Sequence, residues 1–327
     1  MNQPASQKPW QRANTDWLRQ CRWGVMSCYL ADTASNLKPT ALPVSDWNRR
    51  IDAFDVDGLA QQLADALVPY FILTIGQNSG FYLSPNQTYD DIVGIRPSKC
   101  AQRDLIADLA RAFSSRGIRL MAYLPGTAPA SDAIAKERLE GKPDERMTEL
   151  QRNWEAVVRE WSLRWGKSLS GWWIDGPYET AKYQHPDAPN YRSFAEALKA
   201  GNPDSIVAFN DGLRTPLYSM TEYEDYTPGE IERDMTVAAG NTPDYSRLAN
   251  YERFLNGAQL HVLTIMGEWW GKGPVRFPDE LTIGYTKFIN SKGGVVSWDA
   301  PLTTAGLVDP EFYPQLLALG RAISGRS

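Results

Sequence analysis

The stretch SGWWIDG, residues 170–176, is a short apolar run that ends in Asp175 and a glycine. An apolar run of this length without polar alternation indicates a strand of a parallel sheet, buried on both of its faces. An acid that directly follows such a run is held by rigid backbone at the carboxyl end of the strand, where barrel folds place their active sites. The alternative is that Asp175 only caps the turn or helix that follows, but its position favours a functional role.

Seven further runs of this kind flank the central one, and longer amphipathic stretches separate them. The runs cover residues 23–30, 70–75, 118–124, 205–210, 219–226, 259–266 and 294–299, of which 219–226 is the least regular. The amphipathic stretches cover residues 57–67, 103–116, 147–165, 191–200, 279–290 and 310–323. Eight strands that alternate with helices predict an α/β protein, a (β/α)8 TIM barrel. We expect a single domain over residues 1–327, with 1–20 as an N-terminal extension and without a C-terminal β-sandwich.

The composition argues against several classes of protein. The chain of 327 residues is 43% hydrophobic, enough for one large core, and its net charge of -5 disfavours a nucleic acid as partner. Two histidines are too few for the metal centre of a hydrolase barrel, and the three cysteines show no metal-ligand spacing. We therefore expect no metal, no cofactor, and cysteines that stay reduced.

The sequence shows no sign of a membrane or secretion segment. No apolar run is long enough to span a membrane, and the polar N-terminal residues contain no hydrophobic signal core. This predicts a cytoplasmic protein without a membrane partner, although a chain from which a signal had been removed would look the same. A homo-oligomer stays open. The twelve Trp and fifteen Tyr residues fit a carbohydrate partner, because aromatic faces stack on sugar rings, although most Trp side chains in a barrel fill its core.

The residues at the carboxyl ends of the predicted strands form the candidate site, because barrel enzymes build their active sites there. The strand ends also contain Cys28, Tyr123, Asp211 and Asp225. The main candidates are Tyr29, Gln77, Asn78, Trp173, Asp175, Asn210, Glu222, Glu224, Glu268, Trp298 and Asp299. They are acids, amides and aromatics without a cluster of basic residues, so a phosphorylated substrate is disfavoured. Carboxylates beside Trp and Asn suit a hydroxyl-rich ligand and a transition state that resembles an oxocarbenium ion.

Two groups of acids compete for the second catalytic position. The run TEYEDYTPGE, residues 221–230, contains Glu222 and Glu224. We expect at most one or two of its acids to face the site, because charged runs usually form solvated surfaces. Glu268 follows a predicted strand and precedes WWGKG. This context is equally compatible with a position in the site and with a position on a surface loop. His261 lies inside a predicted strand, which favours a hydrogen-bonded histidine of the core.

Six segments, in the same order along the chain, resemble the α-L-fucosidase family of glycoside hydrolases, family 29. They are WGVMSCYL (23–30), LTIGQNSGFYLSPN (73–86), DLIADLARAFSSRGIRLMAYL (104–124), GWWIDG (171–176), EDYTPGE (224–230) and the segment 290–323. The resemblance implies a catalytic barrel in which Asp175 is the nucleophile. Cys28, Gln77 and Asn78 stand where that family has histidines that contact fucose, and His261 stands near the position of its acid/base glutamate. An altered sugar specificity is therefore implied.

The residues and the resemblance together predict a retaining, exo-acting, α-L-fucosidase-like glycosidase. Asp175 attacks the anomeric carbon, and a glutamate first protonates the leaving oxygen and then activates water. We expect Glu268 in this second role, with Glu224 next and Glu222 after it. The expected sugar contacts are Tyr29, Gln77, Asn78, Trp173, Asn210, Glu222, Trp298 and Asp299. The alternatives are an inverting hydrolase or a lyase acting on an unusual sugar, and a carbohydrate-binding protein without catalysis.

Overall fold

A parallel sheet is the centre of the fold. The computed structural model describes residues 9–34, 37–213, 217–231 and 251–325. In this part of the chain seven parallel strands form one sheet in the order β5-β4-β3-β2-β1-β9-β8. The strands are β1 (Trp23–Ser27), β2 (Tyr70–Thr74), β3 (Arg119–Pro125), β4 (Gly171–Asp175), β5 (Ile206–Asn210), β8 (His261–Ile265) and β9 (Val295–Asp299). Seven of the predicted strands are thereby confirmed, with bounds that differ by a few residues at most.

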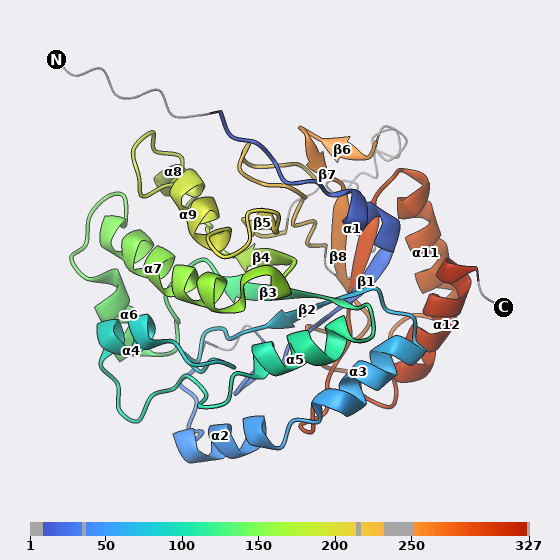
Figure 1. Cartoon of the computed structure of the whole chain (residues 1–327), viewed down its shortest axis with the longest axis horizontal. Helices are drawn as coiled ribbons and strands as arrows, with labels where there is room; N and C mark the ends of the chain where they lie inside the picture. The colour runs from blue at the N-terminus through green and yellow to red at the C-terminus, as the bar shows by residue number, and fades with distance from the viewer. Residues whose placement is uncertain (1–8, 35–36, 214–216, 232–250, 326–327) are drawn as a thin grey trace.

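The helices lie around the outside of this sheet (Figure 1). Those predicted from the sequence are α3 (Val56–Asp65), α5 (Leu105–Ser114), α7 (Thr148–Trp165), α9 (Tyr191–Leu198), α11 (Asp279–Ser291) and α12 (Tyr313–Ser324). Shorter elements are α1 (Asp16–Cys21), α2 (Val44–Asp52), α4 (Gln87–Val93), α6 (Ala133–Glu140), α8 (Thr180–Tyr183), the 3-10 helix η1 (Gly166–Ser168) and a hairpin of β6 (Phe254–Leu255) and β7 (Ala258–Gln259). The side chains of Asp55 and Asp104 cap the first turns of α3 and α5. Within the described residues, no helix combines the length and the apolar character needed to cross a membrane.

The two faces of the sheet carry two separate cores, because successive residues of a strand point to opposite faces. One core contains Met26, Ile72, Met121, Trp173 and Leu263. The other core packs against the helices and contains Val25, Phe71, Leu120, Trp172 and Val262. The first core also includes the buried Leu18 of α1, beside which Trp17 packs. Residues 9–20 of the predicted extension therefore pack onto the sheet, whereas residues 1–8 lie outside the described part.

The sixth strand, predicted at 219–226, does not form, since residues 217–231 contain no regular strand. Residues 225–231 lie instead between β5 and β8. The N–H of Asp225 donates to the carbonyl of Val207 over 2.8 Å, and the N–H of Ile231 donates to the carbonyl of Leu263 over 2.9 Å. Pro228 has no N–H to donate, and Gly229 has a φ of 64°. These two residues interrupt the ladder in the middle of the segment, so the prediction was wrong in both position and regularity.

Carboxylates supply part of the hydrogen bonding that a regular sixth strand would give to β5. The N–H of Val207 donates to Asp225 Oδ2 over 2.8 Å, and the N–H of Phe209 donates to Glu224 Oε1 over 3.0 Å. The other oxygen of Glu224 accepts from Ser219 Oγ over 2.9 Å and from the N–H of Met220 over 2.7 Å. Glu224 is fully buried, and burial raises its pKa to about 7. Its carboxyl group therefore belongs to the framework of the sheet.

Replacement of Glu224 by Gln should lower the stability of the fold. The amide keeps one acceptor oxygen, and its NH2 group would face a backbone N–H that now donates to the carboxylate. An unsatisfied buried donor of this kind costs about 1–3 kcal/mol of unfolding free energy. Denaturant unfolding at pH 8 measures the difference, with the exposed neighbour Glu222→Gln as the matched control. Unchanged unfolding together with lost turnover in the Glu224 variant would return this residue to the catalytic role predicted from the sequence.

Candidate active site

Asp175 ends β4 and receives three hydrogen bonds from residues of different segments. The Tyr123 hydroxyl donates to Oδ2. Asn210 Nδ2 donates to Oδ1 over 2.9 Å, and the Tyr178 hydroxyl donates to the same oxygen over 3.3 Å. Burial raises the pKa of Asp175, and the three hydrogen bonds act in the opposite direction because they favour the ionised carboxylate. The carboxylate is thus fixed in position and supplied with donors on both oxygens.

The hydroxyl of Tyr123 is itself oriented by a second residue. Gln77 Nε2 donates to this hydroxyl over 2.8 Å, so the tyrosine proton is left to bond Asp175. The ring of Tyr123 stacks on Trp173 with centroids 5.1 Å apart and planes at 15°. The indole of Trp173 donates to the carbonyl of Pro228 over 2.9 Å. Two predicted sugar contacts, Gln77 and Trp173, therefore also hold the tyrosine that holds Asp175.

Glu230 is the second carboxylate of the site and was not among the residues predicted from the sequence. Asn210 Nδ2 donates to Glu230 Oε2 over 2.6 Å and to Asp175 Oδ1 over 2.9 Å. Both acids bond the same nitrogen. The distance between Asp175 Oδ1 and Glu230 Oε2 therefore cannot exceed the sum of the two hydrogen-bond lengths. That limit lies within the spacing of roughly 5–5.5 Å between the carboxyl groups of retaining glycosidases.

A cavity of about 70 Å³ opens beside these two acids. It is lined by Met26, Cys28, Ala34, Gln77, Tyr123, Trp173, Asp175, Tyr178, Glu230, Leu263 and Trp270. One part of the lining is acidic and hydrogen-bonding, the other is apolar, and none of these residues is basic. The cavity is smaller than the roughly 300–1,000 Å³ of typical small-molecule sites, so the described residues enclose only the part of a ligand nearest Asp175. Larger hollows elsewhere on the molecule contain neither Asp175 nor Glu230.

Asp299 lies next to this cavity, beside Cys28. Its Oδ2 accepts a hydrogen bond from the N–H of Gly271 over 2.6 Å, whereas Oδ1 is buried without a hydrogen-bond partner. Burial raises the pKa of Asp299 to about 7, and nearby acids together with burial raise that of the Cys28 thiol. Cys28 is therefore a protonated thiol in the wall of the cavity, not a nucleophile.

Replacement of Asp299 by Asn should remove a pH dependence of stability. The folded-state pKa of about 7 lies above the ordinary value of 3.8, so the folded protein holds a proton that the unfolded chain releases in this window. Stability from this group is complete below about pH 4 and is lost as the pH rises to 7. The amide needs no proton, and its oxygen can still accept from Gly271. The stability of Asp299→Asn relative to that of the natural protein should therefore increase as the pH rises from 4 to 8.

A pKa difference of one unit between the folded and unfolded states corresponds to about 1.4 kcal/mol of unfolding free energy, so the expected gain at pH 8 is a few kcal/mol. Denaturant unfolding of both proteins at several pH values measures it. Other buried acids, among them Glu155 with a pKa raised to about 7 by burial, contribute to both curves, so only their difference reports on Asp299. Parallel curves would show that Asp299 is ionised at neutral pH.

Four predicted site residues do not line the cavity because their side chains point elsewhere. The Tyr29 hydroxyl donates to the carbonyl of Thr304 over 2.7 Å, and the Trp298 indole donates to Thr286 Oγ1 over 3.0 Å, both away from the cavity. Each is the chain neighbour of a residue at the site, Cys28 or Asp299, and neighbours in an extended chain face opposite ways. The other two, Glu222 and Glu268, are exposed.

Asn78 and Glu224 are also absent from the lining of the cavity. Asn78 is half-buried, and its carbonyl accepts from the N–H of Ser131 over 2.9 Å. Glu224 is held under β5 by the backbone contacts described above. His261 is a core residue, as its sequence context favours, with ring nitrogens 3.0 Å from the Thr227 carbonyl and 2.8 Å from Ser297 Oγ. In the described part of the chain, no three His, Cys, Asp or Glu side chains are grouped so that they could hold a metal ion.

Glu230 was missed because the sixth element was placed several residues too early. A strand that ended at Tyr226 puts Glu222 and Glu224 near the site, whereas the observed segment 225–231 brings Glu230 to the cavity. The proline and glycine before Glu230 were the available signal, since a Pro-Gly pair indicates a turn next to a strand end. Tyr178 was also missed, and Tyr123 was selected only as a strand-end residue. The hydroxyl contacts of both with Asp175 depend on how separate segments pack.

The fold is similar to those of several solved hydrolases. An endo-fucoidan hydrolase of glycoside hydrolase family 107 matches with a TM-score of 0.68 and 14% identity over 91% of this chain and 90% of its own. A second endo-fucoidan hydrolase of that family matches with a TM-score of 0.68 and 17% identity over 94% of this chain and 54% of its own. The α-L-fucosidase of Lactobacillus casei in complex with α-L-fucose matches with a TM-score of 0.63 and 13% identity over 95% of this chain and 99% of its own.

No protein-family model matches this sequence, and no curated protein matches it. At 13–17% identity the similarity to the solved structures concerns the fold. It agrees with the α/β architecture of parallel strands and surrounding helices predicted from the sequence. The fold is therefore similar to those of enzymes described as endo-fucoidan hydrolases and an α-L-fucosidase.

Proposed function

We propose that this protein is a retaining glycoside hydrolase in which Asp175 is the nucleophile and Glu230 is the acid/base. The observation that carries the proposal is the contact of both carboxylates with one nitrogen, Asn210 Nδ2. It keeps the two acids at the close spacing that a direct attack on the sugar requires, whereas an inverting pair needs roughly 6.5–9.5 Å for an intervening water. Both acids line the same cavity.

The reaction proceeds in two displacements. A carboxylate oxygen of Asp175 attacks the anomeric carbon while Glu230 gives its proton to the leaving glycosidic oxygen, which departs as an alcohol. Glu230, now ionised, takes a proton from water, and the water oxygen displaces Asp175 from the anomeric carbon. Tyr123, Tyr178 and Asn210 stabilise Asp175 as it becomes a carboxylate again, because all three donate to it.

Asn210, predicted as a sugar contact, has a positioning role in this proposal. It is fully buried, and its two amide hydrogens are directed to two different carboxylates. Its Oδ1 is buried and has no hydrogen-bond partner. The amide thereby bridges the two acids and fixes their relative positions. The proposed mechanism requires Asp175 to be ionised and Glu230 to be protonated in the free enzyme.

The cavity supports a neutral sugar with an apolar edge as the substrate. Its wall contains the apolar Met26, Ala34 and Leu263, and none of the described residues that line it is a basic residue that could bind an anionic group. Action on a terminal sugar, which the resemblance of the sequence to α-L-fucosidases implies, is part of the proposal. The similarity of the fold to enzymes described as α-L-fucosidases and endo-fucoidan hydrolases favours α-L-fucosides or related deoxy sugars.

A screen of nitrophenyl glycosides tests this proposal. Release of nitrophenol is expected from one or more of the α-L-fucoside, α-L-rhamnoside, α-L-arabinoside and β-D-galactoside, with the α-L-fucoside tried first. NMR of the first product formed should show the anomeric configuration of the substrate. An inverted product would exclude the double displacement. Sugar binding without release of nitrophenol from any of them would support the alternative of a carbohydrate-binding protein.

A further inference from the structure

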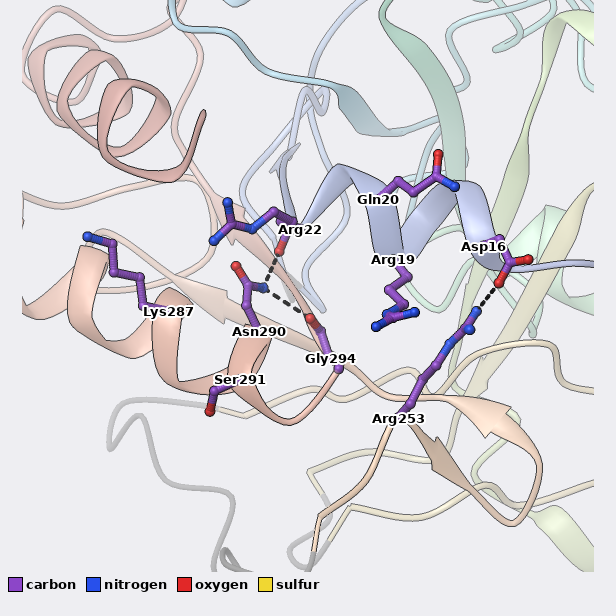
Figure 2. Close-up of a pocket in the computed structure, with 10 residues that line it drawn as sticks. Asp16, Arg19, Gln20, Arg22, Arg253, Lys287, Asn290, Ser291 and Gly294 are labelled. Atoms are coloured by element: carbon purple, nitrogen blue, oxygen red, sulfur yellow. Dashed lines mark hydrogen bonds and ion pairs between the residues drawn. The ribbon is translucent and has the colours of Figure 1, made fainter. Parts of the chain in front are cut away.

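A second hollow lies at the opposite end of the strands from Asp175. Its volume is about 790 Å³, and its walls come from α1, α11 and the segments that precede β6, β1 and β9 (Figure 2). It is lined by Asp16, Arg19, Gln20, Arg22, Arg253, Lys287, Asn290, Ser291, Gly293 and Gly294. Arg22 directly precedes β1 and Gly294 directly precedes β9, so the hollow opens at the amino ends of these strands. It is therefore separate from the catalytic cavity.

Cations dominate this hollow in a chain whose net charge is -5. Arg19, Arg22, Arg253 and Lys287 line it, and among the described residues of its lining Asp16 is the only acid. Asp16 is bonded to Arg253, which also donates to Gln259 Oε1 over 2.9 Å. One of the four cations, Arg253, is thus neutralised and fixed.

The other cations retain donors that are free to bind a ligand. The structure shows no hydrogen bond or ion pair for the side chains of Arg19 and Lys287 among the described residues, and both are exposed. Arg22 uses one nitrogen, Nη1, to bond the carbonyl of Ile323, which leaves its other donors available. The backbone of Arg22 is held in place, because its carbonyl accepts from Asn290 Nδ2 over 2.8 Å. Figure 2 shows Arg19 and Arg253 in one part of the hollow and Arg22 and Lys287 in another.

The rest of the lining restricts the chemistry of a ligand. No aromatic or aliphatic side chain is among the ten residues, so the hollow offers neither a surface for stacking on a sugar nor an apolar floor. Guanidinium groups bind carboxylate and phosphate oxygens through paired hydrogen bonds, and an ammonium group adds a point charge. Since the unpaired cations come from three separate positions, a ligand with several oxyanion groups can engage more of them than a single ion can.

We infer that this hollow is a non-catalytic binding site for a small hydrophilic polyanion, with Arg19, Arg22 and Lys287 as its main contacts. The inference is independent of the proposed hydrolysis, because the site shares no residue with the catalytic cavity. Isothermal titration calorimetry on the whole protein, with inorganic phosphate, citrate and inositol hexakisphosphate at low ionic strength, tests it. Affinity should rise in that order with the number of anionic groups, and it should fall at high salt.

The double variant Arg19→Gln with Lys287→Gln should weaken the binding of citrate by about tenfold or more, because it removes two charge-assisted contacts. The matched control is Arg159→Gln with Lys167→Gln, which makes the same charge change at exposed positions of α7 and η1 and should bind as the natural protein does. Lys287→Gln alone is a milder variant in case the double variant is unstable. Asp175→Asn should bind citrate normally, whatever its activity.

Two results would overturn the inference. The first is equal weakening in the double variant and in its control, which would mean that citrate responds only to the net charge of the protein. The second is the absence of binding for all three probes by the natural protein. A loss of binding confined to the Arg19 and Lys287 variants supports the site.

Discussion

The Asp175→Asn variant should lose hydrolysis of its best nitrophenyl glycoside by roughly 10⁴-fold in kcat, the scale seen when a residue of a catalytic group is removed. The amide cannot form the glycosyl-enzyme, so the loss should appear with every leaving group. The fold should be retained, because Oδ1 of the amide can still accept from Tyr123 or Asn210, two of the three residues that bond the present carboxylate. Steady-state kinetics and circular dichroism measure the two properties.

A strand-end acid outside the cavity provides the comparison. Asp211 follows β5 and accepts from the Tyr218 hydroxyl over 2.7 Å, and it is absent from the cavity lining. Asp211→Asn should retain activity within a few-fold. In the smaller variant Asp175→Gly, azide should restore turnover by taking the place of the nucleophile, with inversion at the anomeric carbon. Substantial unaided activity in Asp175→Asn would refute its assignment as the nucleophile.

The Glu230→Gln variant should show a loss that depends on the leaving group. Without a proton donor, turnover of a glycoside with a poor leaving group should fall by about 10²–10⁴-fold. Cleavage of a dinitrophenyl glycoside should fall much less in the first step, because that leaving group departs without a proton. The alkaline limb of the pH profile of kcat/KM should also disappear, since that limb reports loss of the proton from the acid. Stopped-flow and steady-state measurements on a series of aryl glycosides resolve these effects.

Glu268→Gln is the matched control for Glu230, because Glu268 was predicted for the same role from the sequence. Its side chain is exposed and is not part of the cavity lining. We expect its activity to stay within about twofold of that of the natural protein, as for most surface substitutions. The reverse outcome, with an active Glu230 variant and an inactive Glu268 variant, would restore the sequence-based assignment.

The regular strands were predictable because parallel strands buried on both faces need continuous apolar residues. Runs such as GWWID show this pattern in the sequence. The irregular segment 225–231 was not predictable in this way. It is held by the carboxylates of Glu224 and Asp225 and by single backbone bonds to β5 and β8. Such contacts leave no periodic pattern in the sequence, so the acidic run was interpreted as a strand that ends too early.

The rule that active sites lie at strand ends selected some of the residues that line the cavity beside Asp175, but not all of them. Gln77, Trp173 and Asp175 line the cavity, whereas Tyr29 and Trp298 point away from it. Neighbouring residues of an extended chain point in opposite directions, so an error of one residue in the predicted strand end selects a side chain on the wrong face. The sequence does not define the strand ends to within one residue. Strand-end position alone therefore identifies a small group of candidates.

The sequence by itself determined the parallel α/β architecture and the position of Asp175, because both depend on a local pattern of apolar residues followed by an acid. Only the tertiary structure decided the partner of Asp175. Glu230 follows Asp175 by 55 positions in the chain, and the two meet through Asn210 at the end of a third segment. The distance between the two carboxylates depends on how β4, β5 and the segment 225–231 pack side by side, and no local pattern of residues contains that information.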